Sequence, residues 1–148
     1  MKHIKRFFES KSTTSDDIKE IVKECFEDYM IDYGMIVNFC DGKYIPGYNF
    51  MSNRLLHNLQ LKYPKESKKF EGNYKKCIKV DFNNDGIGSG ERFEIYLDEN
   101  SQNLFDESIH NLHSQLKLIT SGFQLIDVPK YLSSDFYGIG FLILYEDF

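Results

Sequence analysis

Two segments with helical spacing of apolar residues, 15–33 and 101–119, constrain this chain more than any other feature. In the first, a stripe of apolar side chains lies opposite a face rich in Lys and Glu, which is typical of a helix packed on a core. Thr14 or Ser15 can cap its start, and Gly34 can end it. The stripe consists of Ile18, Ile21, Val22, Cys25, Phe26, Tyr29 and Met30.

The second segment repeats this pattern, so we predict a second amphipathic helix. Asn100 or Ser101 can cap its start, and Gly122 stands where a C-terminal cap is expected. Its apolar residues recur every three or four positions; they are Phe105, Ile109, Leu112, Leu116 and Ile119.

Alternation of apolar and polar residues predicts half-buried strands at 78–82 and 93–97. The residues between them are rich in Asn, Asp and Gly, so an antiparallel hairpin is the simplest arrangement.

A second hairpin is predicted earlier in the chain, where Asp41-Gly42 separates the apolar runs 35–40 and 43–46. Pro46 indicates that its second strand is short or lies at a sheet edge. Residues 50–75 fit a helix or a strand equally well.

The segments 15–50 and 101–146 share one layout, namely helix, glycine, strand, turn and strand, without useful sequence identity. We therefore predict an α+β fold, with a mostly antiparallel sheet and two amphipathic helices packed on one face in helix–strand–strand units. Residues 15–148 form a single domain on this interpretation, and residues 1–14 form a basic aromatic N-terminal arm.

The last predicted strand, within 137–145, is apolar on both faces from Phe141 onward. Either it is a central strand covered on both sides, or one face meets a partner. A homo-oligomer formed through this strand is therefore one expectation.

Charge and composition bear on the class of partner. The net charge is −5, whereas a nucleic-acid-binding domain is usually basic, so we do not expect nucleic acid as the partner. A lysine-rich stretch in 62–79 is interpreted as a solvated connector. It contains Lys62, Lys65, Lys68, Lys69, Lys75, Lys76 and Lys79.

The sequence contains no uncharged apolar run of about 18 residues, so we expect no membrane span. The three cysteines, Cys25, Cys40 and Cys77, have neither metal-ligand nor redox spacing. They are interpreted as free thiols of an intracellular protein.

Residues 81–92 match the first half of an EF-hand calcium loop, with oxygen ligands at alternate positions and a glycine at the sixth. The candidate metal ligands are Asp81, Asn83, Asp85, Ser89 and Glu91. The twelfth position holds Arg92 where a bidentate Glu is required, and the predicted flanks are strands. A plain turn of Asn, Asp and Gly residues is the other interpretation.

No arrangement of catalytic residues stands out. The sequence lacks a Gly-x-Ser-x-Gly elbow and a phosphate-binding glycine loop before a helix, so nothing positive indicates an enzyme. We expect no resident cofactor other than the possible Ca²⁺ of residues 81–92.

The N-terminal arm places Phe7 and Phe8 beside Lys5 and Arg6. These four residues either fold back on the domain or dock onto a protein partner.

Residues 1–10 also resemble the short leaders of small virion and accessory proteins of large tailed bacteriophages, with Lys2, Phe7 and Glu9 in the matching positions. In part of that group the leader looks like a head-targeting peptide that is cut after a Glu, so the resemblance implies a cut after Glu9. Phe7 matches in position but not in residue type, because the pattern has Leu or Ile two residues before the Glu. The resemblance implies a location in the host cytoplasm or the virion.

We therefore expect a non-enzymatic protein-interaction protein, with a phage virion or accessory component as one form of it. A small inhibitor or host-takeover protein that binds a basic partner through its acidic C-terminal half is a second hypothesis. A calcium-binding module built on residues 81–92 is a third.

Overall fold

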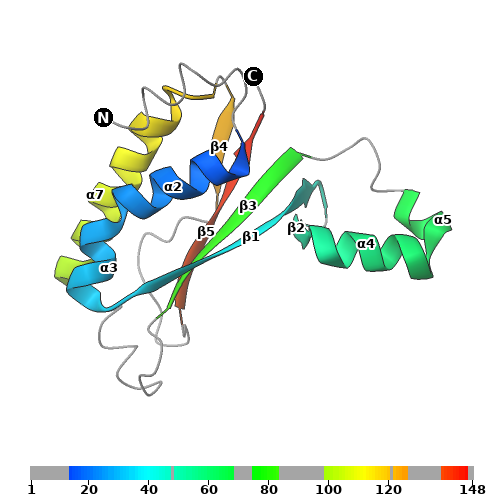
Figure 1. Cartoon of the computed structure of the whole chain (residues 1–148), viewed down its shortest axis with the longest axis horizontal. Coiled ribbons are helices and arrows are strands. Elements are labelled where there is room, and N and C mark those ends of the chain that lie inside the picture. Colours follow the sequence, from blue (N-terminus) through cyan, green and yellow to red (C-terminus); the bar gives the residue numbers. More distant parts are fainter. Residues whose placement is uncertain are drawn as a thin grey trace.

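The computed structural model describes residues 14–47, 49–68, 75–83, 99–120, 122–126 and 138–146. Helices and strands follow one another in an order that confirms the α+β class (Figure 1). They are α2 (Ser15–Cys25), α3 (Glu27–Tyr33), β1 (Ile36–Ile45), β2 (Asn49–Ser52), α4 (Asn53–Lys62), α5 (Pro64–Ser67), β3 (Lys75–Asn83), α7 (Glu99–Leu116), β4 (Phe123–Ile126) and β5 (Gly138–Tyr145).

The strands form one antiparallel sheet in the order β2-β1-β3-β5-β4. β3 is central and pairs along its length with β1 on one side and β5 on the other. The two predicted helix–strand–strand units therefore flank a single strand. The predicted hairpin between 78–82 and 93–97 does not account for the neighbours of β3, and residues 93–97 lie outside the described part of the chain.

The first predicted helix forms, but as two helices separated by a turn at Phe26. Thr14 caps α2 through a reciprocal capping box with Asp17, and Gly34 ends α3 in the left-handed conformation (φ 62°). The turn places the Phe26 side chain in the core, where it is completely buried. The expected apolar stripe is thus the packed face of both helices.

Helices α2, α3 and α7 cover the same face of the sheet, as Figure 1 shows. Aromatic rings fill the space between the two layers. The rings of Phe82, Phe105 and Phe141 lie 4.7, 5.3 and 5.8 Å from that of Phe26, centroid to centroid. This cluster joins both helical units to β3 and β5.

The predicted hairpin turn at Asp41-Gly42 is wrong, because both residues lie inside the continuous strand β1. The chain turns at Pro46-Gly47 instead, and β2 pairs back onto β1 at the edge of the sheet. Glycine at position 42 allows β2 to approach β1 closely, since a Cβ there would lie 2.2 Å from the Met51 carbonyl oxygen and 2.7 Å from the Phe50 ring. Asp41 forms an ion pair with Lys19.

The second predicted helix forms as α7, with different ends. It begins at Glu99, so Asn100 and Ser101 lie within its first turn. It ends at Leu116, where a tight turn buries Ile119. Gly122 is not its cap, because it directly precedes β4 and its carbonyl accepts a hydrogen bond from the Glu146 amide.

The last strand, β5, is an interior strand with side chains buried on both faces. Ile139, Phe141 and Ile143 pack under the helices, whereas Leu142 and Leu144 pack with Cys77 on the opposite face. β3 occupies one edge of β5, and β4 pairs with its residues from Leu142 to Tyr145 on the other. The homo-oligomer expected through this strand stays a prediction.

Candidate interaction surface

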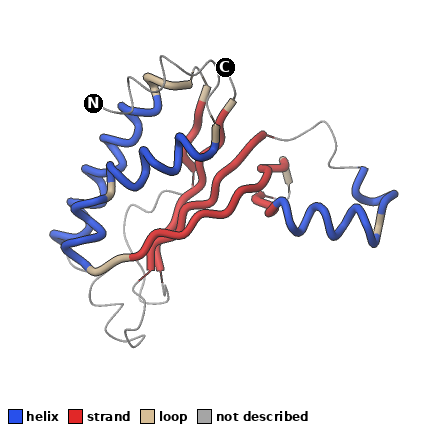
Figure 2. Tube along the Cα trace, in the orientation of Figure 1, coloured by secondary structure: helices blue, strands red, loops and turns tan. Residues whose placement is uncertain are grey.

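The undecided segment 50–75 contains the most unusual part of the structure, a helical projection formed by α4 and α5 (residues 53–68). The Ser52 hydroxyl accepts a hydrogen bond from the Leu55 amide at 3.1 Å, so the helix begins directly after β2. Pro64 occupies the first position of α5, where its missing amide hydrogen costs nothing. The helical projection extends from the β1–β2 end of the sheet, away from α2, α3 and α7 (Figure 2).

Apolar side chains on the helical projection remain in contact with solvent. None of the residues of α4 is buried. Leu61 keeps 70% of its surface exposed, Tyr63 keeps 55% and Leu55 keeps 46%. Burial of a leucine side chain is worth about 1.5–3 kcal/mol, so these residues represent stabilisation that the isolated chain does not use. Exposed apolar area is typical of a protein-interaction surface, and Leu61 and Tyr63 supply it close together in the chain at the junction of α4 and α5.

The helical projection is also basic. Its cations are Arg54, Lys62, Lys65 and Lys68, and its one carboxylate is Glu66. The lysines of this segment belong to the stretch 62–79, which the sequence predicts to be a solvated connector. Lys69 of that stretch lies outside the described residues. Lys62, Lys65 and Lys68 share the exposed helical projection with Leu55 and Leu61, so this segment combines positive charge with apolar area.

The opposite end of the molecule is acidic. Exposed carboxylates cover the outer face of α2 and α3: Asp16, Glu20, Glu24, Glu27, Asp28 and Asp32. In α3 they surround Ile31, which is 70% exposed, and the described α3 contains no basic residue. We call Glu27, Asp28, Ile31 and Asp32 the acidic α3 face.

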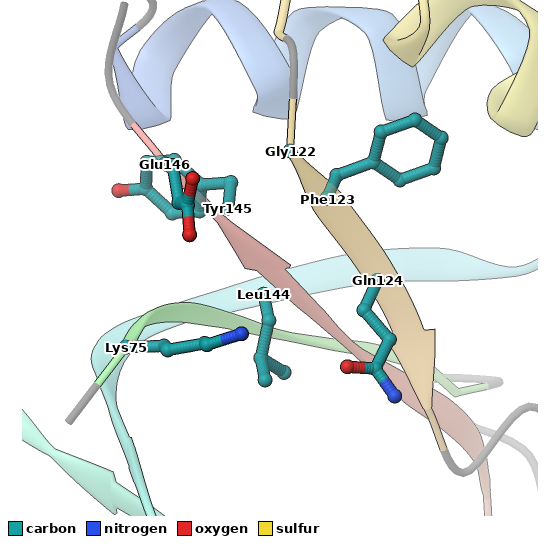
Figure 3. Close-up of a pocket in the computed structure, with 7 residues that line it drawn as sticks. All are labelled: Lys75, Gly122, Phe123, Gln124, Leu144, Tyr145 and Glu146. Carbon is teal, nitrogen blue, oxygen red and sulfur yellow. The ribbon is translucent and has the colours of Figure 1, made fainter.

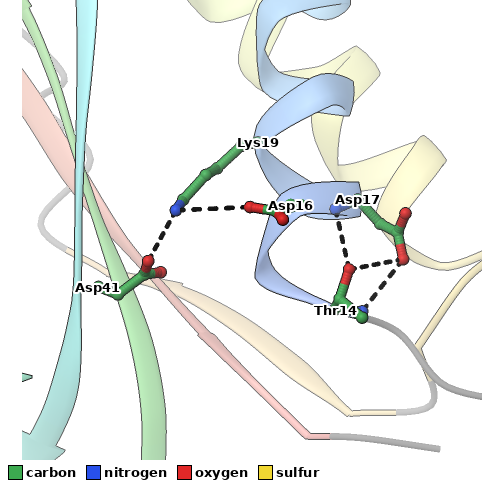
Figure 4. A network of polar contacts seen from close by, with 5 residues as sticks. All are labelled: Thr14, Asp16, Asp17, Lys19 and Asp41. Carbon is green, nitrogen blue, oxygen red and sulfur yellow. Dashed lines mark hydrogen bonds and ion pairs between the residues drawn. The ribbon is translucent and has the colours of Figure 1, made fainter.

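One acidic residue near this layer has a structural role instead. The Lys19 ammonium lies 2.7 Å from Asp41 Oδ2 and 3.9 Å from Asp16 Oδ1, and it ties α2 to β1 (Figure 4). Thr14 and Asp17 form hydrogen bonds with each other at the start of the same helix. Asp41 is therefore part of the scaffold that holds α2 on the sheet.

A small open pocket of about 130 Å³ lies where β3, β4 and β5 meet near their ends (Figure 3). The Lys75 ammonium points toward Leu144, and Gln124 extends on the other side of that leucine. Pockets that enclose a small-molecule ligand usually measure about 300–1,000 Å³. This pocket is well below that range, so it does not provide a candidate active site. Its lining residues are Lys75, Gly122, Phe123, Gln124, Leu144, Tyr145 and Glu146.

Only the start of the predicted calcium loop is described, and it is a strand. Asp81 and Asn83 lie two residues apart on β3, so their side chains leave the same face of the sheet. Burial raises the pKa of Asp81, and the nearby Lys79 ammonium opposes this increase. Asp85, Ser89 and Glu91 lie outside the described residues, and the calcium site stays a prediction.

The described part of the chain contains no group of three or more His, Cys, Asp or Glu side chains that could hold a metal ion. All three cysteines are free thiols. Burial raises the pKa of Cys77 to about 12 and that of Cys25 to about 11, so both are protonated at neutral pH and are poor nucleophiles.

The predicted docking residues of the N-terminal arm, Lys5, Arg6, Phe7 and Phe8, lie outside the described residues, as does Glu9. None of the helices in the described ranges is long and apolar enough to cross a membrane. The helical projection was not predicted as a site. Its signal in the sequence is the combination of leucines and lysines in 54–68.

Comparison of the chain with protein-family models, curated proteins and solved structures gives no match.

Proposed function

We propose that this chain is a protein-interaction protein and that the helical projection docks onto an acidic, partly apolar surface of a protein partner. The observation that carries this proposal is the exposure of Leu55 and Leu61 on α4, a helix with no buried residue, and of Tyr63 directly after it. The fold holds α4 in place through β2 and Ser52, so the projection is presented from a packed sheet.

The chemistry of the helical projection favours a protein over a nucleic acid. A phosphate backbone would neutralise Lys62, Lys65 and Lys68 but would leave the leucines in water. An acidic protein surface with an apolar centre would bury the leucines and pair the lysines at the rim, which is the usual arrangement of protein interfaces.

The N-terminal arm is proposed as a second docking segment of the same protein. Phe7 and Phe8 beside Lys5 and Arg6 repeat the combination of apolar area and positive charge found on the helical projection. With the phage-like leader, this supports a role as a virion or accessory component. Deletion of residues 1–13 should abolish binding to any partner of the arm and leave the fold intact.

Affinity capture from the native source tests the role of the helical projection. The tagged chain is compared with Leu61→Asp and with the control Leu118→Asp, which changes a leucine 58% exposed after α7. We expect capture of a protein that Leu61→Asp loses and that Leu118→Asp retains, with weaker capture as salt increases. Identical captured proteins from all three chains would contradict the proposal.

A further inference from the structure

The partner of the helical projection must offer a carboxylate-rich surface with an apolar centre, and the acidic α3 face has this chemistry. Ile31 lies one helical turn after Glu27 and Asp28, and Asp32 follows it directly. All four side chains are exposed. The helical projection offers the complementary set, with Leu61 and Tyr63 next to Lys62 and Lys65.

One residue of the acidic α3 face, Asp32, opposes the stability of its own helix. Asp32 lies in the last turn of α3, which contains no basic residue. The C-terminal end of a helix carries partial negative charge, so a carboxylate there is unfavourable and a cation from outside would be stabilising. A docked lysine would relieve this local conflict.

One molecule cannot join its own two surfaces. In Figure 1, α3 lies at one end of the molecule, and α4 and α5 project from the other. Two different surfaces on the same protein can meet only between copies, in a head-to-tail contact. Such a contact repeats and builds rings or chains of subunits, whereas a two-fold dimer would use one surface twice.

We infer that the partner of the helical projection is a second copy of this chain, bound through its acidic α3 face. This inference rests on the proposed function. The contact buries Leu61 against Ile31 and places Lys62 and Lys65 beside Asp28 and Asp32. Because the charged groups are exposed, the association weakens when salt shortens the screening length.

Sedimentation velocity of the full chain tests the inference with two charge-reversed variants. The first, K62E/K65E, changes the helical projection, and the second, D28K/D32K, changes the acidic α3 face. Wild type should give species heavier than the monomer whose share increases with concentration and falls between about 50 and about 500 mM salt. Each variant alone should be monomeric, and the control K117E, at an exposed position after α7, should associate like wild type.

An equimolar mixture of the two variants gives the sharpest outcome. Each variant carries two surfaces of the same charge sign, so each repels its own copies but both of its surfaces match the other variant, and the mixture should recover the species heavier than the monomer. Circular dichroism must give wild-type spectra for both variants. A monomeric wild type at all concentrations, or a D28K/D32K variant that dimerises alone, would overturn the inference. Neither result affects the proposed function, which depends on whether Leu61→Asp loses a captured protein.

Discussion

Replacement of Gly42 by alanine should separate β2 from β1. The added Cβ would lie 2.2 Å from the Met51 carbonyl oxygen and 2.7 Å from two atoms of the Phe50 ring. The ring can rotate, but the carbonyl belongs to the paired strand, so the backbone of β2 must move. Forcing an extra group into a packed site costs about 1–3 kcal/mol, and a backbone contact belongs at the upper end, so we expect about 2–3 kcal/mol. A loss of this size lowers Tm by roughly 6–12 °C for a chain of this length.

Urea denaturation of Gly42→Ala measures this loss, and Gly47→Ala provides the matched control. Gly47 has a positive φ of 86° but open space around it, so alanine there costs only backbone strain of about 1 kcal/mol. Adding Phe50→Leu to Gly42→Ala should recover only part of the loss, because the carbonyl remains. A Gly42→Ala protein as stable as Gly47→Ala would refute the reasoning and favour a turn at Asp41-Gly42.

Three further predictions concern the core, the thiols and the predicted calcium loop. Phe26→Ala removes a completely buried ring and should lower the free energy of unfolding by about 3–5 kcal/mol in urea; a loss below about 1 kcal/mol would contradict the described core. Burial raises the pKa of Cys77 to about 12, so iodoacetamide at pH 8 should modify the half-buried Cys40 well before Cys77 in the native protein. Rapid labelling of Cys77 in the native protein would argue against its burial. The free energy of unfolding should also fall as pH increases above about 8.5, the pKa of a thiol in the unfolded chain, because the unfolded chain then loses protons that the native chain keeps. Calorimetric titration should detect Ca²⁺ binding that Asp85→Ala abolishes, and a wild type without binding, or a variant with unchanged binding, removes the calcium loop.

The helices could be predicted because the spacing of their buried apolar residues is enough to identify them. The stripe from Ile18 to Tyr29 is buried except at Cys25, which is partly buried, so its spacing records the position of the core. The division at Phe26 left no sign in that spacing, because a single non-helical residue shifts the stripe very little.

The strand pairing could not be predicted from local sequence. Asp-Gly favours a turn, yet glycine is equally suited to a strand that another backbone approaches closely. Whether Gly42 lies in a turn or in a strand depends on Phe50 and Met51, which pack against it only after the chain reverses at Gly47. The neighbours of β3 likewise depend on residues distant along the chain, since Phe82 pairs with both Val37 and Ile139.

The candidate site escaped prediction for a related reason. Leu55 and Leu59 fit a helix, whereas Leu59 and Leu61 fit a strand, and the core that would decide between them does not cover this segment. A lysine-rich stretch is usually a solvated surface, and only the exposure of Leu61 and Tyr63 beside it supports the docking role that we propose. Such a surface consists of residues that the rest of the fold does not cover, so its position depends on the whole structure.

The central position of β3 has a consequence for the order in which the protein folds. Ribosomal synthesis delivers β1 and β3 long before β5, and until residues 138–145 emerge, one edge of β3 has no partner strand. Ile78, Val80 and Phe82 meanwhile lack their cross-strand neighbours on β5, which are Ile143, Phe141 and Ile139. Pairings between distant segments form slowly, and an unpaired apolar edge invites aggregation. The final strand therefore completes the core, and a nascent chain arrested before residue 138 should depend on chaperones to remain in solution.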